Sequence, residues 1–487
     1  MFLTTLASLL VLGTAFSTPT LTTASATTAT TPTLWLTNHS STVKSIVPLV
    51  LDISPLVVTG AQFTSDECVS ALHADTGKLF WSSTVLAEWT YGVAVQPDQG
   101  ANGGSRGVAA FGCPFDPGTA PISPCELGFF KDVTDGTLAW KIAIPGAEVG
   151  ASAGPPSVAF TPDGESIVVT FVDRNSTSNP GAEFMAVVSV ANPKATPSRA
   201  TLGAGTGHGL HLATGKTSDS TVRALLSRHD ATSNTDLHVD VQFAGAGAPI
   251  TVAPDPSIDC NGTSVCGWMA SSPDLSTVIV DARPATMSGS VCPYQPQNPL
   301  MWGFALLTRN GARAQAARYS TAWAKCSGAS NAKVMTSLHL ASSGAQIITS
   351  FVHVDPNTSS VVAAEVCAFD AARGDESWCT PLYEVDPPLS SPSALVPSVA
   401  TLSEDDRLVF SLASVGLLHV DASPRNGAPQ KIGLLYGRDG VDDCCAPTAV
   451  TVADDFLVAS IPYGTQSGIW CNCRGSRLFG LKLPSAA

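Results

Sequence analysis

The stretch ALHADTGKLFW, from Ala71 to Trp81, joins an apolar strand to a turn glycine and to a tryptophan four residues after that glycine. Gly77 can adopt the positive φ that a tight hairpin requires, and Trp81 begins the next strand with a large side chain that can pack on a neighbouring sheet. Two later segments, KDVTDGTLAW (131–140) and AFDAARGDESW (368–378), repeat the spacing. The repeat motif therefore comprises Asp75, Gly77, Trp81, Gly136, Trp140, Asp370, Gly374 and Trp378.

A second kind of turn recurs before apolar or alternating runs, and it is acidic or rich in glycine. It is found at VQPDQG (95–100), TPDGES (161–166), SPDLST (272–277), SEDDRL (403–408) and VADDFL (452–457). These turns begin 66, 111, 131 and 49 residues apart, which fits one or two periods of roughly 45 to 70 residues, the period of four-stranded propeller blades that carry loop insertions.

This period predicts an all-β chain folded as a single eight-bladed β-propeller of four-stranded antiparallel blades, with seven blades as the alternative. The predicted blades are 43–86, 90–146, 153–203, 207–253, 265–319, 333–383, 395–435 and 446–482. The last unit is one strand short, and we expect Thr33 to Thr37 to complete it and to close the ring. Two β-sandwiches would not explain the repeated spacing from glycine to tryptophan, and helical patterns of ten or more residues are absent.

At the motif residues the chain resembles the quinoprotein-like propellers of the pyrroloquinoline-quinone-repeat type, in which blades carry an Ala-x-Asp-x-x-x-Gly-x-x-x-Trp pattern. Three units match it, and in two others Gly311 and Gly427 keep a turn glycine without the tryptophan. The resemblance implies either a dehydrogenase that binds pyrroloquinoline quinone and calcium or a non-catalytic or divergent member. No cofactor is predicted; the quinone with calcium would follow only if the dehydrogenase interpretation held.

Composition and the N-terminus predict an exported protein. Residues 1–26 have the character of a signal peptide, cleaved after Ser17 or Ala26, and 27–32 form a Thr-rich linker before the propeller at 33–487. A net charge of −14 and a pI of about 4.9 argue against nucleic acid as a partner. No later run is apolar enough to span a membrane. We expect the mature chain to be secreted, and we expect it to be a monomer.

The 13 cysteines agree with an oxidising compartment. Proximity in the repeat predicts pairs Cys113–Cys125, Cys260–Cys266, Cys292–Cys326 and Cys367–Cys379, with Cys444 and Cys445 joining Cys471 and Cys473. Cys68 remains as the odd thiol. Glycosylation sequons begin at Asn38, Asn175, Asn261 and Asn357, and we expect all four on loops.

The insertions predict where a partner binds. The longest, at 112–126, 173–182, 283–299, 355–360 and 463–476, fall between second and third strands of the predicted blades, while the opposite face is expected to carry short turns. Insertions gathered on one face typically mark the binding side. We therefore expect a protein- or glycan-binding scaffold module; the alternative is an extracellular enzyme, either a hydrolase or a quinone-dependent dehydrogenase.

Residue patterns of known catalytic and metal sites do not identify a catalytic, cofactor-binding or metal-ligating residue. Gly150 to Gly154 match G-x-S-x-G, but Pro155 and Pro156 prevent the helix that an esterase elbow needs. His208 and His211 would point to opposite faces of a strand. Acid pairs at 405–406 and 454–455 fit turn geometry, and the pair at 442–443 fits a solvated loop. His339, His353 and His419 lie in apolar strands, where packing or hydrogen bonding is the simpler interpretation.

Overall fold

The computed structural model describes the strands and the tight turns between many of them. Its described residues are 33–39, 42–50, 55–62, 68–84, 86, 89–97, 106–113, 124–144, 158–173, 182–194, 197–204, 211–216, 222–230, 235–243, 251–253, 263–272, 274–284, 303–309, 319–326, 333–341, 343–355, 361–389, 397–402, 406–412, 416–421, 432–437, 449–467 and 470–483. Every regular element among them is a β-strand, as predicted. The signal peptide and linker predicted for 1–32 lie outside these residues.

Antiparallel pairing gives six four-stranded sheets and one eight-stranded sheet among the described strands. The two halves of the larger sheet meet at the single pair Gln62 and Trp89, so we describe the strands as eight four-stranded units, blades 1 to 8. Blades 1 and 2 are β2 (Thr42–Val50), β3 (Pro55–Gln62), β4 (Val69–His73), β5 (Leu79–Ser83), and β6 (Trp89–Val95), β7 (Val108–Cys113), β8 (Cys125–Asp132), β9 (Thr137–Ile144). Blades 3 and 4 are β10 (Val158–Phe160), β11 (Ser166–Asp173), β12 (Ala182–Ser189), β13 (Ser198–Ala204), and β14 (His211–Lys216), β15 (Val222–Asp230), β16 (Thr235–Phe243), β17 (Thr251–Ala253). Blades 5 and 6 are β18 (Thr263–Ser271), β19 (Thr277–Pro284), β20 (Gly303–Arg309), β21 (Tyr319–Cys326), and β22 (Lys333–Leu340), β23 (Gln346–Val354), β24 (Val361–Asp370), β25 (Glu376–Leu389). Blades 7 and 8 are β26 (Pro397–Leu402), β27 (Arg407–Leu412), β28 (Gly416–Asp421), β29 (Ile432–Gly437), and β30 (Ala449–Ala453), β31 (Phe456–Ser467), β32 (Trp470–Lys482), β1 (Thr33–His39).

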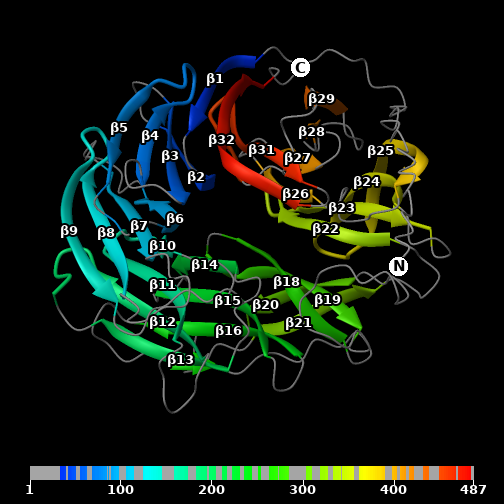
Figure 1. Cartoon of the computed structure of the whole chain (residues 1–487). Coiled ribbons are helices and arrows are strands. Elements are labelled where there is room, and N and C mark those ends of the chain that lie inside the picture. Colours follow the sequence, from blue (N-terminus) through cyan, green and yellow to red (C-terminus); the bar gives the residue numbers. More distant parts are fainter. Residues whose placement is uncertain are drawn as a thin grey trace, which may run out of the picture.

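The blades are arranged in a closed ring. The first strand of each blade contacts the first strand of the next, from β2 through β6, β10 and onward to β30, and β30 returns to contact β2 (Figure 1). Blades 1 and 2 are further joined by a single bridge between Gln62 and Trp89. This arrangement of antiparallel sheets around a centre is a β-propeller.

The N-terminal strand completes the last blade. β1 pairs with β32, with Leu36 opposite Phe479 and Thr37 opposite Leu478 (Figure 1). Because β32 follows β31 in the chain and β1 precedes blade 1, the two ends of the described chain share one sheet. This confirms the prediction that Thr33 to Thr37 close the ring.

An indole from one blade docks on a turn of the next blade. A Cβ added at Gly136 would lie 2.5 Å from Trp81 Cδ2, and one added at Gly374 would lie 2.8 Å from Trp323 Cε3. Both glycines have a positive φ, of 65° and 72°. The glycine makes the turn, and its missing side chain leaves room for a tryptophan of the preceding blade.

Each docked indole also donates a hydrogen bond to the same turn. The acceptor is the backbone carbonyl of the first residue after the third strand, in the pairs Trp35–Ala74 (2.8 Å), Trp81–Val133 (2.5 Å), Trp140–Val190 (3.0 Å) and Trp323–Ala371 (3.0 Å). The amide of that acceptor residue is fixed within its own blade; for example, Ala371 N donates to Ala345 O at 2.9 Å. A buried indole N–H needs such an acceptor, so each contact also fixes the orientation of its ring.

Buried apolar clusters fill the space between neighbouring blades. One joins Phe111 and Phe129 of blade 2 to Phe160 and Phe171 of blade 3. Comparable clusters join blades 5 and 6, blades 7 and 8, and blades 8 and 1. The apolar residues of the strands therefore stabilise the ring as a whole rather than single sheets.

Two features differ from the sequence-based expectations. The predicted insertion at 463–476 is instead mostly a long hairpin of β31 and β32, in which Gly464 pairs with Cys473 and Ser467 with Trp470. Blade 5 does have a docking tryptophan: Trp323 lies in β21, after the long connection 310–318, so the spacing from Gly311 does not reveal it.

The docking contact can be tested with two glycines of similar backbone conformation. Gly136→Ala adds both strain at positive φ and a clash with the Trp81 ring, whereas Gly344→Ala adds only the strain, because nothing lies within 4 Å of its Cβ. We expect Gly136→Ala to lower the free energy of unfolding by about 1–3 kcal/mol more than Gly344→Ala. Denaturant unfolding of both variants measures this difference, and equal losses would contradict the docking role.

Candidate functional site

The ring has two ends that differ in their connections. At one, the loop-bearing end, lie the connections between second and third strands and those between blades, including 114–124, 145–157 and 285–302. At the other, the turn-bearing end, lie the hairpins between first and second and between third and fourth strands. The expectation that this end carries only short turns is wrong, because the connections 96–107, 310–318 and 422–431 belong to it.

A disulfide closes the base of one long loop at the loop-bearing end. Cys113 is the last residue of β7 and Cys125 the first of β8, and their sulfurs are bonded as predicted. Both side chains are buried. The bond therefore fixes the two points where the connection 114–124 leaves the sheet.

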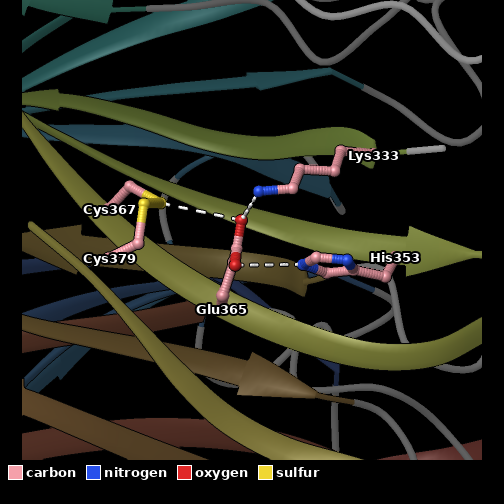
Figure 2. Close-up of a disulfide and its surroundings, with 5 residues drawn as sticks. All are labelled: Lys333, His353, Glu365, Cys367 and Cys379. Carbon is pink, nitrogen blue, oxygen red and sulfur yellow. Dashed lines mark hydrogen bonds and ion pairs between the residues drawn. A yellow bond between two sulfur atoms is a disulfide. The ribbon is translucent and has the colours of Figure 1, made fainter. Parts of the chain in front are cut away.

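A compact cluster of charged residues lies at the same end, in blade 6. Lys333 at the start of β22 and His353 near the end of β23 both bind the carboxylate of Glu365 on β24 (Figure 2). His353 Nε2 lies 3.1 Å from Glu365 Oε2, and Lys333 Nζ contacts Oε1. Strand register brings the three together, because Lys333 pairs with His353 and Phe351 pairs with Glu365.

The predicted disulfide Cys367–Cys379 borders this cluster. It joins directly opposed residues of β24 and β25, and Cys367 Sγ lies 3.7 Å from Glu365 Oε1 (Figure 2). Cys367 is buried, while Cys379 is partly exposed. The disulfide and the carboxylate thus share one half-buried site between strands of a single blade.

The cluster holds Glu365 in its charged form. Burial raises the pKa of Glu365, but hydrogen bonds from His353 and Lys333, together with their positive charges, outweigh burial and leave the pKa below its ordinary value. The carboxylate is therefore a permanent acceptor near neutral pH, unlike a general acid, whose pKa must be raised toward the working pH.

The site does not fit the calcium that accompanies a quinone cofactor. Among the described residues, one group of three potential ligands has its atoms within 4.8 Å of one another: Glu365, Cys367 and Cys379. Calcium takes six to eight oxygen ligands, whereas this group offers one carboxylate and two sulfurs joined to each other. The adjacent cysteines Cys444 and Cys445 lie outside the described residues.

Several candidates from the sequence take structural positions. Asp406 and Asp454 occupy hairpin turns with φ of 60° and 56°, which explains these acids by turn geometry as expected. Asp370 accepts hydrogen bonds from the amides of Ala372 and Arg373, both at 2.9 Å. Cys68 is a buried thiol whose Sγ donates to Leu86 O at 3.6 Å.

Only some of the glycosylation candidates and remaining disulfide candidates lie within the described residues. Asn38 is exposed but lies in β1, opposite Arg477, so its placement on a loop was wrong: pairing with β32 extends the strand to His39. Strands contain Cys266, Cys326, Cys471 and Cys473. Outside the described residues lie Asn175, Asn261, Asn357, Cys260, Cys292, Ser152, His208, Asp442 and Asp443.

Comparisons with known proteins do not assign the chain to a family. No protein-family model and no curated protein sequence matches the chain. Solved structures resemble it at low identity: the Dos1 propeller (9% identity, TM-score 0.49, covering 93% of this chain and 95% of that one) and the periplasmic gluconolactonase of Pseudomonas aeruginosa (12%, 0.42, 77% and 94%). Prolyl oligopeptidase B from Galerina marginata matches at 11% identity and a TM-score of 0.46, over 88% of this chain and 54% of its own. At such scores the likenesses carry no functional argument, and the fold rests on the strand pairing itself.

The charged cluster predicts a defined pH dependence of stability. Since the pKa of Glu365 is lowered on folding, its stabilising contribution is present above the unfolded pKa of about 4.3 and is lost as the pH falls through the lower folded value. We expect Glu365→Gln to lower the free energy of unfolding by about 1–2 kcal/mol at pH 5. This difference from wild type should shrink as the pH falls below the unfolded pKa of about 4.3.

Denaturant unfolding across this pH range measures the effect. The matched control is Glu126→Gln, which removes a more exposed carboxylate bound to Lys141 at 3.0 Å and should change stability little. A loss for Glu365→Gln that does not shrink as the pH falls below about 4.3 would contradict the assignment.

Proposed function

We propose that the protein is an exported, disulfide-stabilised scaffold that binds a protein or glycan through the loop-bearing end of its ring. The observation that carries the proposal is the fixed base of that end. In blade 2 the disulfide Cys113–Cys125 clamps the connection 114–124, and in blade 6 ion pairs join the strand ends around Glu365. Loops held on a rigid base lose little conformational entropy on binding, which favours affinity.

The chemistry of the charged cluster supports binding over catalysis. Its carboxylate is already neutralised by two partners of the same blade and has a lowered pKa. Hydrolysis by paired carboxyl groups would instead need acids with separated pKa values on both sides of a substrate. We accordingly propose a binding module that is a divergent, non-catalytic relative of the quinoprotein-like propellers, in agreement with its glycine and tryptophan repeat.

Export is supported by the disulfides and by the N-terminal sequence. Cross-links such as Cys113–Cys125 and Cys367–Cys379 persist in oxidising compartments. The described part of the chain has no helix of the length and apolar character that crossing a membrane requires. The exposed sequon at Asn38 would carry a glycan in such a compartment.

Two engineered glycans can distinguish the ends of the ring. Ser82→Asn creates a sequon with Thr84 in the exposed end of β5, at the loop-bearing end of blade 1. Asp135→Asn creates one with Thr137 in the exposed turn between β8 and β9, at the turn-bearing end of blade 2. Both variants are secreted from eukaryotic cells and applied to arrays of immobilised glycans and extracellular proteins.

We expect the Ser82→Asn glycoform to weaken binding to the array by at least about tenfold, which corresponds to 1.4 kcal/mol. The Asp135→Asn glycoform should bind as the wild type does. Loss of binding with Asp135→Asn alone, or turnover of an arrayed ligand, would refute the proposed binding face or the scaffold role.

A further inference from the structure

We propose that reduction of the disulfide Cys367–Cys379 opens a zinc site made of Cys367, Cys379 and Glu365, with water as the fourth ligand. The proposal goes beyond partner binding and does not rest on it. It begins from the group of three ligand atoms, all within 4.8 Å of one another. In the oxidised protein the two sulfurs bond to each other, so the site exists only after reduction.

The spacing already suits tetrahedral coordination. With bonds of about 2.0–2.3 Å, neighbouring ligand atoms of a tetrahedral zinc site lie about 3.3–3.8 Å apart. Cys367 Sγ and Glu365 Oε1 are 3.7 Å apart. Cys367 and Cys379 are directly opposed on β24 and β25, so their thiolates can separate to a similar distance by side-chain rotation.

The charges also balance. Two thiolates and the Glu365 carboxylate carry three negative charges, which a divalent cation and Lys333 offset, and protonated His353 would add one further positive charge. A half-buried site whose negative charges are offset in this way avoids the cost of uncompensated charge. Thiolate ligands favour zinc over magnesium or calcium.

His353 positions the third ligand. Its Nε2 holds Glu365 Oε2 at 3.1 Å, so that Oε1, which Lys333 Nζ also contacts, lies on the side of Cys367 (Figure 2). Partners of this kind orient a ligating group without touching the metal. His353 is therefore a positioning residue in the reduced state.

Opening the disulfide requires an external reductant that supplies two electrons. A phosphine cleaves the Sγ–Sγ bond, takes the oxygen of one water to become the phosphine oxide, and leaves one hydrogen on each sulfur. A thiol reductant supplies the same two electrons by forming its own disulfide. Binding of one Zn²⁺ then displaces two protons from the thiols. Cys379 is the partly exposed sulfur that a reductant reaches first.

The test uses the full chain reduced with a phosphine, with or without zinc chloride, and then alkylated with iodoacetamide. Mass spectrometry of the peptides follows each cysteine separately. We expect zinc to slow alkylation of Cys367 and Cys379 at least about tenfold and to leave Cys113 and Cys125 unchanged, since those two belong to no such group among the described residues. Cobalt(II) in place of zinc should give a thiolate charge-transfer band that Cys367→Ser/Cys379→Ser removes.

Two carboxylate variants provide the matched comparison. Glu365→Gln keeps the shape of the side chain but should abolish most of the zinc protection of Cys367 and Cys379 from alkylation. Glu126→Gln, beside Cys125, should retain all of that protection. His353→Gln should weaken zinc binding by about tenfold while keeping the ligand set.

Three outcomes would overturn the proposal. They are alkylation that is indifferent to zinc, equal protection in the Glu365→Gln and wild-type chains, and loss of the β-sheet circular dichroism on reduction, since the site requires the folded sheet.

Discussion

One contact recurs at four of the described blade boundaries and sets how the blades meet there: the indole of an outer strand lies over a turn of the next blade. At Gly136 and Gly374 a side chain would collide with the ring, and the indole N–H bonds to the carbonyl three residues before each glycine. One blade cannot bury its apolar faces by itself, so it needs its neighbour. The indole gives this neighbour contact both area and direction, and the apolar clusters between blades follow from it.

A ring of such contacts needs a first and a last member that meet. Trp35 serves this purpose, because it lies on β1, joins blade 8 through pairing with β32, and donates to Ala74 O of blade 1. The N-terminal strand thus supplies both the missing strand and the missing indole. In the closed ring the first strand of each blade faces the first strands of its neighbours, which protects these edges from pairing with another chain.

The sequence predicted this architecture where its signal is local. A glycine and a tryptophan four residues apart describe one hairpin, and such hairpins identified three turns correctly. The spacing did not reveal Trp323, because the connection 310–318 separates it from its turn. It did not reveal Trp35 either, because β1 pairs with β32 from the other end of the chain and no hairpin glycine precedes this tryptophan. The hairpin at 463–476 resembled a loop because glycine and asparagine are poor strand formers, and only pairing with the facing strand overrides that tendency.

The charged cluster around Glu365 could not be predicted from the sequence for a related reason. Lys333, His353 and Glu365 come from three strands, and only the register of β22, β23 and β24 brings them together. By contrast, Cys367 and Cys379 flank a recognisable hairpin motif, so their pairing could be predicted. Contacts within one hairpin can be predicted from the sequence, whereas contacts that involve three strands or two blades cannot.

Closure by β1 is the central claim, and hydrogen exchange of the native full-length chain tests it most directly. If β1 is the outer strand of blade 8, about every second amide of a peptide covering Thr33–His39 should be protected, because the strand is hydrogen-bonded to β32 on one side only. Exchange of that peptide at the rate of an unstructured chain, while β32 stays protected, would contradict the closed ring.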